Sequence, residues 1–116
     1  MASTVPALQL ESSLKHQAPA PLYLIVGEED LLRDAALAAI KSAVLGDRDE
    51  FNYDLFYGDD ATGADILTAA SEMPVFAERR LVVVKAAEKL PSRESEALQD
   101  FLKQPVETTT LVFVSA

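Results

Sequence analysis

The stretch that decides the fold of this chain is residues 22–32, LYLIVGEEDLL. An apolar run followed by a glycine and acidic residues indicates a buried strand, a turn and the start of a helix. In many nucleotide-binding proteins a phosphate loop occupies this position, with several glycines followed by Lys and Ser or Thr. Here Gly27 is followed by the carboxylates of Glu28, Glu29 and Asp30. Carboxylates are stabilised at the positive end of a helix but repel phosphate there, so we predict a nucleotide-binding fold without its phosphate site.

A second strand carries the same kind of loss. Residues 81–84, LVVV, have the continuous apolar character of a buried strand. In ATPases of the AAA+ type such a strand ends in Asp-Glu, where Asp holds magnesium and Glu orients the attacking water. Here Lys85 and Ala86 follow, and Glu88 comes later, at the start of a loop or helix. Because lysine cannot bind magnesium and alanine cannot activate water, we predict no ATP binding, no hydrolysis, no cofactor and no catalytic residue.

The composition indicates one globular domain. The chain has 116 residues, 49% of them apolar, which is enough for a modest core. A net charge of -9 disfavours unaided DNA binding and points to a protein partner, although an acidic soluble surface explains it equally well. The absence of cysteine excludes disulfides and thiolate metal sites. The apolar runs are too short for a bilayer and no secretion signal is visible, so we expect a cytoplasmic protein without a membrane partner.

The N-terminal segment is expected to be separate from the main domain. Residues 1–5 are predicted to be a loose terminus. Residues 6–16 are predicted to form an amphipathic helix, because Leu10 and Leu14 lie one turn apart. A proline-rich break follows it. We therefore assign residues 1–20 to an N-terminal amphipathic helix and linker.

The remainder, residues 21–116, alternates strands and helices. We expect strands at 22–26, 51–57, 81–84 and 109–115, and helices at 29–45, 63–71 and 92–103. Such alternation implies right-handed crossovers, a parallel sheet and an α/β domain of three layers. The chain ends at the fourth strand with no helix to cover it, which we interpret as a truncation.

Local signals predict how these elements end and which faces they bury. Gly46 ends the first helix, and Thr62 and Ser92 cap the next two. The aromatic residues of strand 51–57 are predicted to lie in the core. The expected buried residues of the first helix are Leu32, Ala35, Ala36, Ala39, Ile40 and Ala43, and those of the last are Ala97, Leu98, Phe101 and Leu102.

One connector is a candidate binding site. Residues 73–77, MPVFA, join a helix to a strand, and connectors normally lie on the surface. Phe76 either folds inward or, with Val75, forms an apolar tip that enters a partner's pocket. Two other candidates have simpler explanations. His16 is interpreted as structural or solvated, and the acidic cluster at 28–30 as stabilising a helix start rather than binding magnesium.

Taken together, these segments resemble the N-terminal domain of the delta subunit of bacterial DNA polymerase III, the clamp-opening arm of the sliding-clamp loader. The resemblance rests on residues 21–32, 51–52, 58–60 and 73–90, in that order and spacing, and on the shared lack of nucleotide motifs. It covers nearly the whole chain. It implies an AAA+-like domain that binds and opens the sliding clamp, so that the clamp can be loaded on DNA, without itself binding ATP.

The resemblance also implies a site and partners. In this family a tip of a small residue, an apolar residue and Phe enters a hydrophobic pocket on the clamp. Carried over, the clamp-binding residues are Met73, Pro74, Val75 and Phe76. Relatives often have leucine at the position of Val75, and valine is shorter and stiffer. The family's lid and collar domains, which contact the other loader subunits, are absent here, and DNA is contacted only indirectly in the full complex.

Two alternatives start from the same residues. A receiver domain of a two-component system also begins with a strand followed by acidic residues, as in residues 24–34. That fold needs a phosphate-accepting Asp at the end of strand 81–84, where this chain has Lys85. The other alternative is an NTP-dependent enzyme with divergent motifs, which the two losses described above disfavour.

Overall fold

A computed structural model of the 116-residue chain describes residues 2–3, 20–46, 52–75 and 77–116. Within these ranges the strands form one parallel sheet in the order β1-β2-β5-β4-β3. The strands are β1 Ala2–Ser3, β2 Leu22–Val26, β3 Tyr53–Tyr57, β4 Arg80–Lys85 and β5 Thr109–Ser115. The helices are α2 Asp30–Leu45, α3 Gly63–Ser71, the 3-10 helix η1 Ala87–Lys89, α4 Ser92–Glu96 and α5 Gln99–Lys103.

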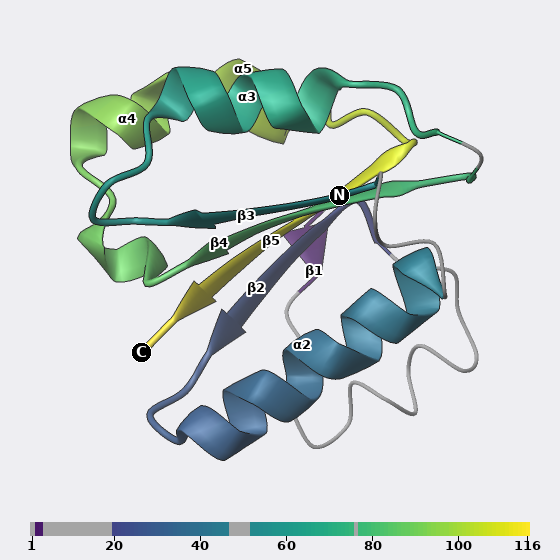
Figure 1. Cartoon of the computed structure of the whole chain (residues 1–116). Helices are drawn as coiled ribbons and strands as arrows, with labels where there is room; N and C mark the ends of the chain where they lie inside the picture. Colours follow the sequence, from purple (N-terminus) through teal and green to yellow (C-terminus); the bar gives the residue numbers. More distant parts are fainter. Residues whose placement is uncertain (1, 4–19, 47–51, 76) are drawn as a thin grey trace.

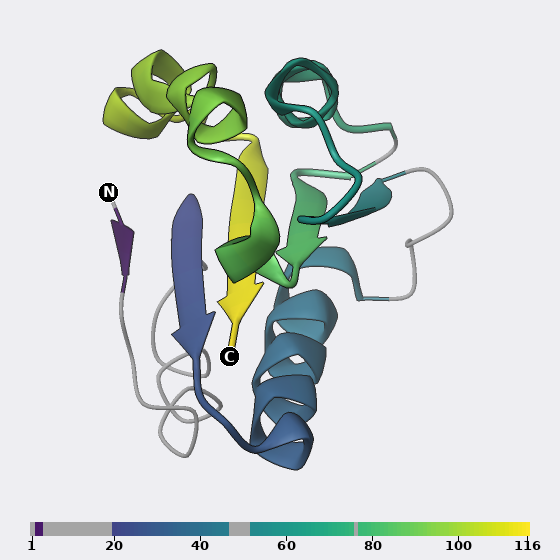
Figure 2. The same cartoon turned by 90° about the vertical axis from the view of Figure 1, so that its left-hand side faces the viewer.

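The sheet lies between two helical layers (Figures 1 and 2), with α2 on one face and α3, α4 and α5 on the other. The fold explains why residues 81–84 of strand β4 are all apolar. Leu81 and Val83 pack toward α2, whereas Val82 and Val84 pack toward the other helices. All four side chains are fully buried, as expected for a central strand of a parallel sheet. The predicted three-layer α/β architecture is therefore confirmed.

The order of the strands excludes the receiver alternative. In a receiver-like sheet the first strand lies between the second and third. Here β2 lies between β1 and β5, and β4 separates β5 from β3. The strand that follows β2 in the chain is therefore at the far edge, so the receiver reading is wrong.

The N-terminal segment differs in part from the prediction. Ala2 and Ser3 pair in parallel with Leu22 and Tyr23, so these two residues are not a loose terminus. An unpaired strand edge offers free backbone groups, which explains why a short segment can add to β2. The predicted helix at 6–16, and His16 with it, lie outside the described residues and stay predictions.

Helix α2 ends as predicted but buries a rotated face. Gly46 follows it with a positive φ of 57°, a conformation that glycine adopts freely. Ala35 and Ala43 were expected inside but are exposed, whereas Leu37 is buried beside Ile40. Alanines contribute little apolar area, so the larger side chains decide which face meets the sheet.

Strand β3 departs from the prediction because it is an edge strand. Tyr57 and Leu55 are 47% and 38% exposed, so the prediction that the aromatics of this strand are core is wrong for Tyr57. Phe56, on the opposite face, does pack against the core near α3. On the α2 side, the Lys41 ammonium lies 4.5 Å from the ring centroid of Tyr53. The alternation of side chains between the two faces of this strand was predicted correctly. The partial exposure of an edge strand depends on strand order, which the local sequence does not give.

The predicted helix at 92–103 is split into α4 and α5. Leu98 sits at the break, where its N–H bonds to the carbonyl of Ser95 at 3.0 Å, and its side chain is fully buried. Phe101 is also buried, whereas Ala97 is exposed and Leu102 only half-buried. Ser92 is the first helical residue and does not cap the helix by its side chain.

The cap predicted at the shorter helix is confirmed. Thr62 accepts the Asp65 N–H at 3.1 Å and so begins α3. Among the described helices, none is long and apolar enough to cross a membrane.

Candidate functional site

The carboxyl edge of the sheet, where a phosphate loop would lie, is occupied by contacts within the chain. The Arg33 guanidinium donates to the Gly27 carbonyl and forms an ion pair with Asp30. The Gly27 N–H donates to the Ser115 carbonyl at 3.2 Å, which joins the turn to β5. The side chains of Glu28 and Glu29 are exposed. The turn therefore presents carboxylates to solvent, and the Gly27 N–H is already hydrogen-bonded to β5.

The end of β4 at the same edge is packed backbone against backbone. The Gly58 N–H donates to the Lys85 carbonyl at 2.8 Å. A Cβ at Gly58 would lie 2.1 Å from the Ala86 oxygen, so this close approach requires glycine. Glu88 is on η1, and hydrogen bonds from its own N–H and then from that of Ala116 hold its carboxyl pKa below the usual value. Across the described residues, no three His, Cys, Asp or Glu side chains are grouped as a metal site.

The amino edge of the sheet has a different character. In the described ranges the buried polar or charged side chains are Asn52, Arg80, Thr109 and Thr110. Asn52 directly precedes β3, Arg80 begins β4, and the two threonines begin β5. Open α/β sheets usually place ligand-binding groups at the carboxyl ends instead. In this chain the buried polar groups gather at the edge where α3 connects to β4 (Figure 1).

That connection, residues 72–79, is here called the tip connector, and Asn52 holds its middle. The Asn52 Oδ1 accepts the Val75 N–H at 2.6 Å, and its Nδ2 donates to the Val75 carbonyl at 2.8 Å. The Asn52 carbonyl also accepts the Leu81 N–H at 2.7 Å. The Asn52 side chain is fully buried, whereas Val75 is 41% exposed, so the two bonds to Val75 are partly buried. Both backbone polar groups of Val75 are thus paired with one side chain.

Two arginines hold the ends of the tip connector. Arg80, only 3% exposed, forms ion pairs with Asp54 of β3 and, at 3.6 Å, with Glu72 at the start of the connector. Its Nε also donates to the Ala69 carbonyl of α3 at 3.3 Å. Arg79 donates to the Glu107 carbonyl at 2.9 Å. A buried guanidinium needs such partners, and they join the two ends of the connector to the sheet and to α3.

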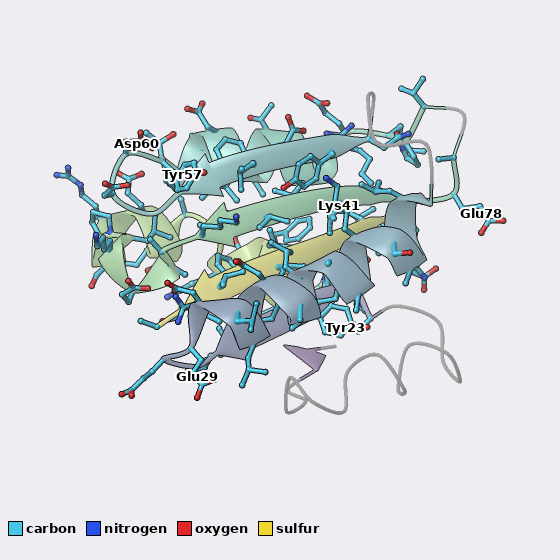
Figure 3. The ribbon with its side chains drawn as sticks, turned by 60° about the horizontal axis from the view of Figure 1, so that its bottom comes forward. Tyr23, Glu29, Lys41, Tyr57, Asp60 and Glu78 are labelled. Carbon is cyan, nitrogen blue, oxygen red and sulfur yellow. The ribbon has the colours of Figure 1, made fainter. Side chains whose placement is uncertain are left out.

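The tip connector presents apolar side chains to solvent. Met73 is 70% exposed and Val75 is 41% exposed, while Pro74 is half-buried. Phe76, the fourth predicted residue, lies outside the described residues. In Figure 3, Glu78 of this connector lies at the end of the sheet opposite to Glu29 and Asp60.

Asn52 and Arg80 were not predicted as site residues. A signal for Arg80 was present, because a charge at the head of an apolar strand must find partners if it is buried. Asn52 appeared only as part of the family resemblance. Its role depends on Val75, which is 23 residues away in the chain.

Comparison with known proteins agrees with this architecture. Residues 23–116 match the family described as DNA polymerase III, delta subunit. The structure is similar to the Bacillus subtilis DNA clamp loader delta protein, with a TM-score of 0.84, 24% identity, and coverage of 94% of this chain and 35% of that chain. It is also similar to a DNA polymerase III gamma subunit-related protein of Thermotoga maritima, with a TM-score of 0.70, 15% identity, and coverage of 96% of this chain and 39% of that chain. A search of curated proteins finds no match.

These matches support different levels of conclusion. At such low identities the two solved structures establish the fold, and this chain spans only about a third of the length of each. The family match covers most of the chain and includes β2 through β5. The resemblance proposed from the sequence is thereby confirmed. The chain belongs to the DNA polymerase III delta subunit family, as an N-terminal domain of that subunit.

Proposed function

We propose that this chain is the clamp-binding domain of a clamp-loader delta subunit, which binds and opens the sliding clamp so that it can be loaded on DNA. Residues 21–116 form the AAA+-like domain in this proposal, with Ala2–Ser3 added at the edge of its sheet, and residues 6–16 form the proposed N-terminal helix. The clamp-binding residues are Met73, Pro74, Val75 and Phe76. The other loader subunits are contacted through lid and collar domains outside these residues, DNA only indirectly, and the complex acts in the cytoplasm.

The observation that carries the proposal is the tip connector itself. Its exposed apolar side chains, Met73 and Val75, lie on a backbone that the buried Asn52 holds in the middle. Arg80, which is buried, and Arg79, which is partly exposed, hold its two ends. An apolar group that fills a partner's pocket is the usual form of a binding hot spot. A backbone already held in shape loses less entropy on binding. Both features favour a protein partner with an apolar pocket.

A mechanical role without ATP fits the carboxyl edge. The exposed carboxylates at the start of α2 disfavour phosphate, and Lys85 and Ala86 stand where magnesium and water would be handled. We therefore propose that the domain is not an enzyme and uses no cofactor. A ring interface exchanges between closed and open states, and a protein that binds the open state better shifts that balance by its differential affinity.

The proposal is tested by Phe76→Ala in a binding measurement with the cognate sliding clamp. A hot-spot aromatic contributes about 2 kcal/mol or more, so the affinity should fall by roughly thirtyfold or more. On this proposal the melting temperature should change little, because removing a side chain that enters the clamp's pocket leaves no internal cavity in this domain. Leu31→Ala is the matched control, since Leu31 is highly exposed on α2 and should not affect clamp binding. Unchanged affinity in folded Phe76→Ala contradicts the proposal, as does a stability loss of about 3 to 5 kcal/mol, which marks a core residue.

A further inference from the structure

We infer that Asn52 is a positioning residue for clamp binding: it holds the backbone at Val75 so that the tip connector is presented in its binding shape. The inference rests on the proposed function for the identity of the partner. Its geometric part, the fixation of Val75, is independent of any partner. Asn52 itself is fully buried and so touches no clamp.

The chemistry of the two bonds specifies an asparagine. The Val75 N–H needs an acceptor and its carbonyl needs a donor, and the primary amide of Asn52 supplies both from one side chain. Aspartate has nearly the same shape but has no donor for the carbonyl and adds a charge in a buried site. Leaving a partly buried carbonyl unpaired is unfavourable, so the connector would move until water replaces the lost hydrogen bond.

The position of the bonds explains why they matter for the tip. The other described anchors are at the ends of the connector, where Arg80 pairs with Glu72 and Arg79 bonds to Glu107. Val75 lies between these anchors and directly follows Met73 and Pro74. Asn52 therefore constrains the part of the connector that carries the exposed apolar side chains.

The register of the sheet places Asn52 where it can do this. Tyr53 pairs with Leu81, and the Asn52 carbonyl accepts the Leu81 N–H. Asn52 is thus attached to the start of β4 by its backbone and to the connector by its side chain. The amino edge of the β3–β4 pair acts as the base on which the connector is held.

The expected consequence is a change in the fraction of molecules that are ready to bind. The apparent dissociation constant equals the intrinsic one divided by the fraction of the competent conformation. If releasing Val75 leaves about a tenth of the molecules competent, Asn52→Asp weakens clamp binding about tenfold. The substitution would act without removing any side chain that contacts the clamp.

The first measurement is hydrogen exchange at the Val75 amide, monitored by NMR on this chain without the clamp. In Asn52→Ser we expect this amide to exchange at least about tenfold faster, because the shorter serine side chain removes the Oδ1 acceptor of the Val75 N–H. Asn52→Asp keeps an acceptor for the N–H but removes the donor to the Val75 carbonyl, so a smaller increase is expected there. Ile40→Val and Ile40→Ala are matched controls, since Ile40 is fully buried on the sheet-facing side of α2 and its truncation lowers stability away from the connector. A Val75 amide that exchanges at the wild-type rate in both Asn52 variants overturns the inference.

The second measurement is a double-mutant cycle of Asn52→Asp and Phe76→Ala in clamp binding. If Asn52 acts only through the tip, its substitution should weaken binding about tenfold alone and have almost no further effect in the Phe76→Ala background. Equal losses in both backgrounds overturn the inference, as does an equal loss in an Ile40 variant of the same melting temperature. If Phe76→Ala weakens binding and the Asn52 variants do not, the inference alone fails. If neither substitution changes the affinity, the proposed function is wrong, and with it the role of Asn52 in clamp binding.

Discussion

The two edges of the sheet handle polar groups in opposite ways. At the carboxyl edge, Glu28, Glu29 and Asp30 are exposed to solvent. At the amino edge, Asn52 and Arg80 are buried and hydrogen-bonded to the tip connector or to the elements at its ends. Buried polar groups are stable only when they are paired in a defined geometry. The comparison teaches that a fold whose usual ligand edge presents carboxylates to solvent can hold its most constrained geometry at the opposite edge.

The strongest way to break this comparison is Arg80→Met. It removes the ion pairs to Asp54 and Glu72 and the bond to the Ala69 carbonyl, while keeping a side chain of similar length. We expect a loss of about 3 kcal/mol in the free energy of unfolding, measured by urea denaturation. Arg93→Met is the control, because Arg93 is exposed and its pair with Glu94 contributes less than about 0.5 kcal/mol. Similar small effects at both arginines would mean that the amino edge is not specially constrained.

A second prediction tests the carboxyl edge. Gly58→Ala would place a methyl group 2.1 Å from the Ala86 oxygen, so the backbone must shift. We expect a loss of about 2 kcal/mol by the same urea measurement, with clamp affinity unchanged because the tip connector is at the other edge. Gly27→Ala is the matched control at this edge, since its new Cβ would meet no atom within 4 Å. A fall in clamp affinity in folded Gly58→Ala would show that the two edges are coupled.

The smallest predicted effect is a pH dependence from Tyr53 on the edge strand. Burial, and then the neighbouring Tyr57, raise the pKa of Tyr53 above 10.0. A phenol with a raised folded-state pKa contributes stability that is fully present below the unfolded pKa of about 10 and is lost as the pH rises through the folded value. Between pH of about 9 and about 11, wild type should lose more stability than Tyr53→Phe in urea titrations. Parallel losses in the two proteins would contradict the assignment.

Local sequence signals predicted the central strands well. The apolar runs at 81–84 of β4 and 111–114 of β5 belong to strands covered by helices on both sides. Strand β2 is also an apolar run but is buried on one face only, with Leu24 and Val26 exposed on the other. Edge strand β3 shows the limit of such signals. Its alternation was visible, but the exposure of Tyr57 depends on how far α2 extends across the sheet. The buried face of α2 was also not fixed by local signals. Its many alanines allow several faces of the helix to pack on the sheet.

Some residues of the candidate site could be predicted from the sequence and others could not. Met73, Pro74 and Val75 could be assigned from the connector and the family resemblance, and their location on the α3–β4 connection is now described. Asn52 could not be assigned, because the register that pairs Tyr53 with Leu81 is needed to bring its amide to Val75. Arg80 could be flagged as a charge at a strand start, but not matched to Asp54 or Glu72.

The sequence by itself determined the α/β alternation, the carboxylates that follow Gly27, the lysine that ends β4, and the family. These follow from residue type and spacing along the chain, which act through local backbone preference and burial. Only the tertiary structure decided that the buried polar side chains gather at the amino edge and that Asn52 holds Val75. The physical reason is that a hydrogen bond between residues far apart in the chain depends on strand order and register, and these are set by packing of the whole sheet.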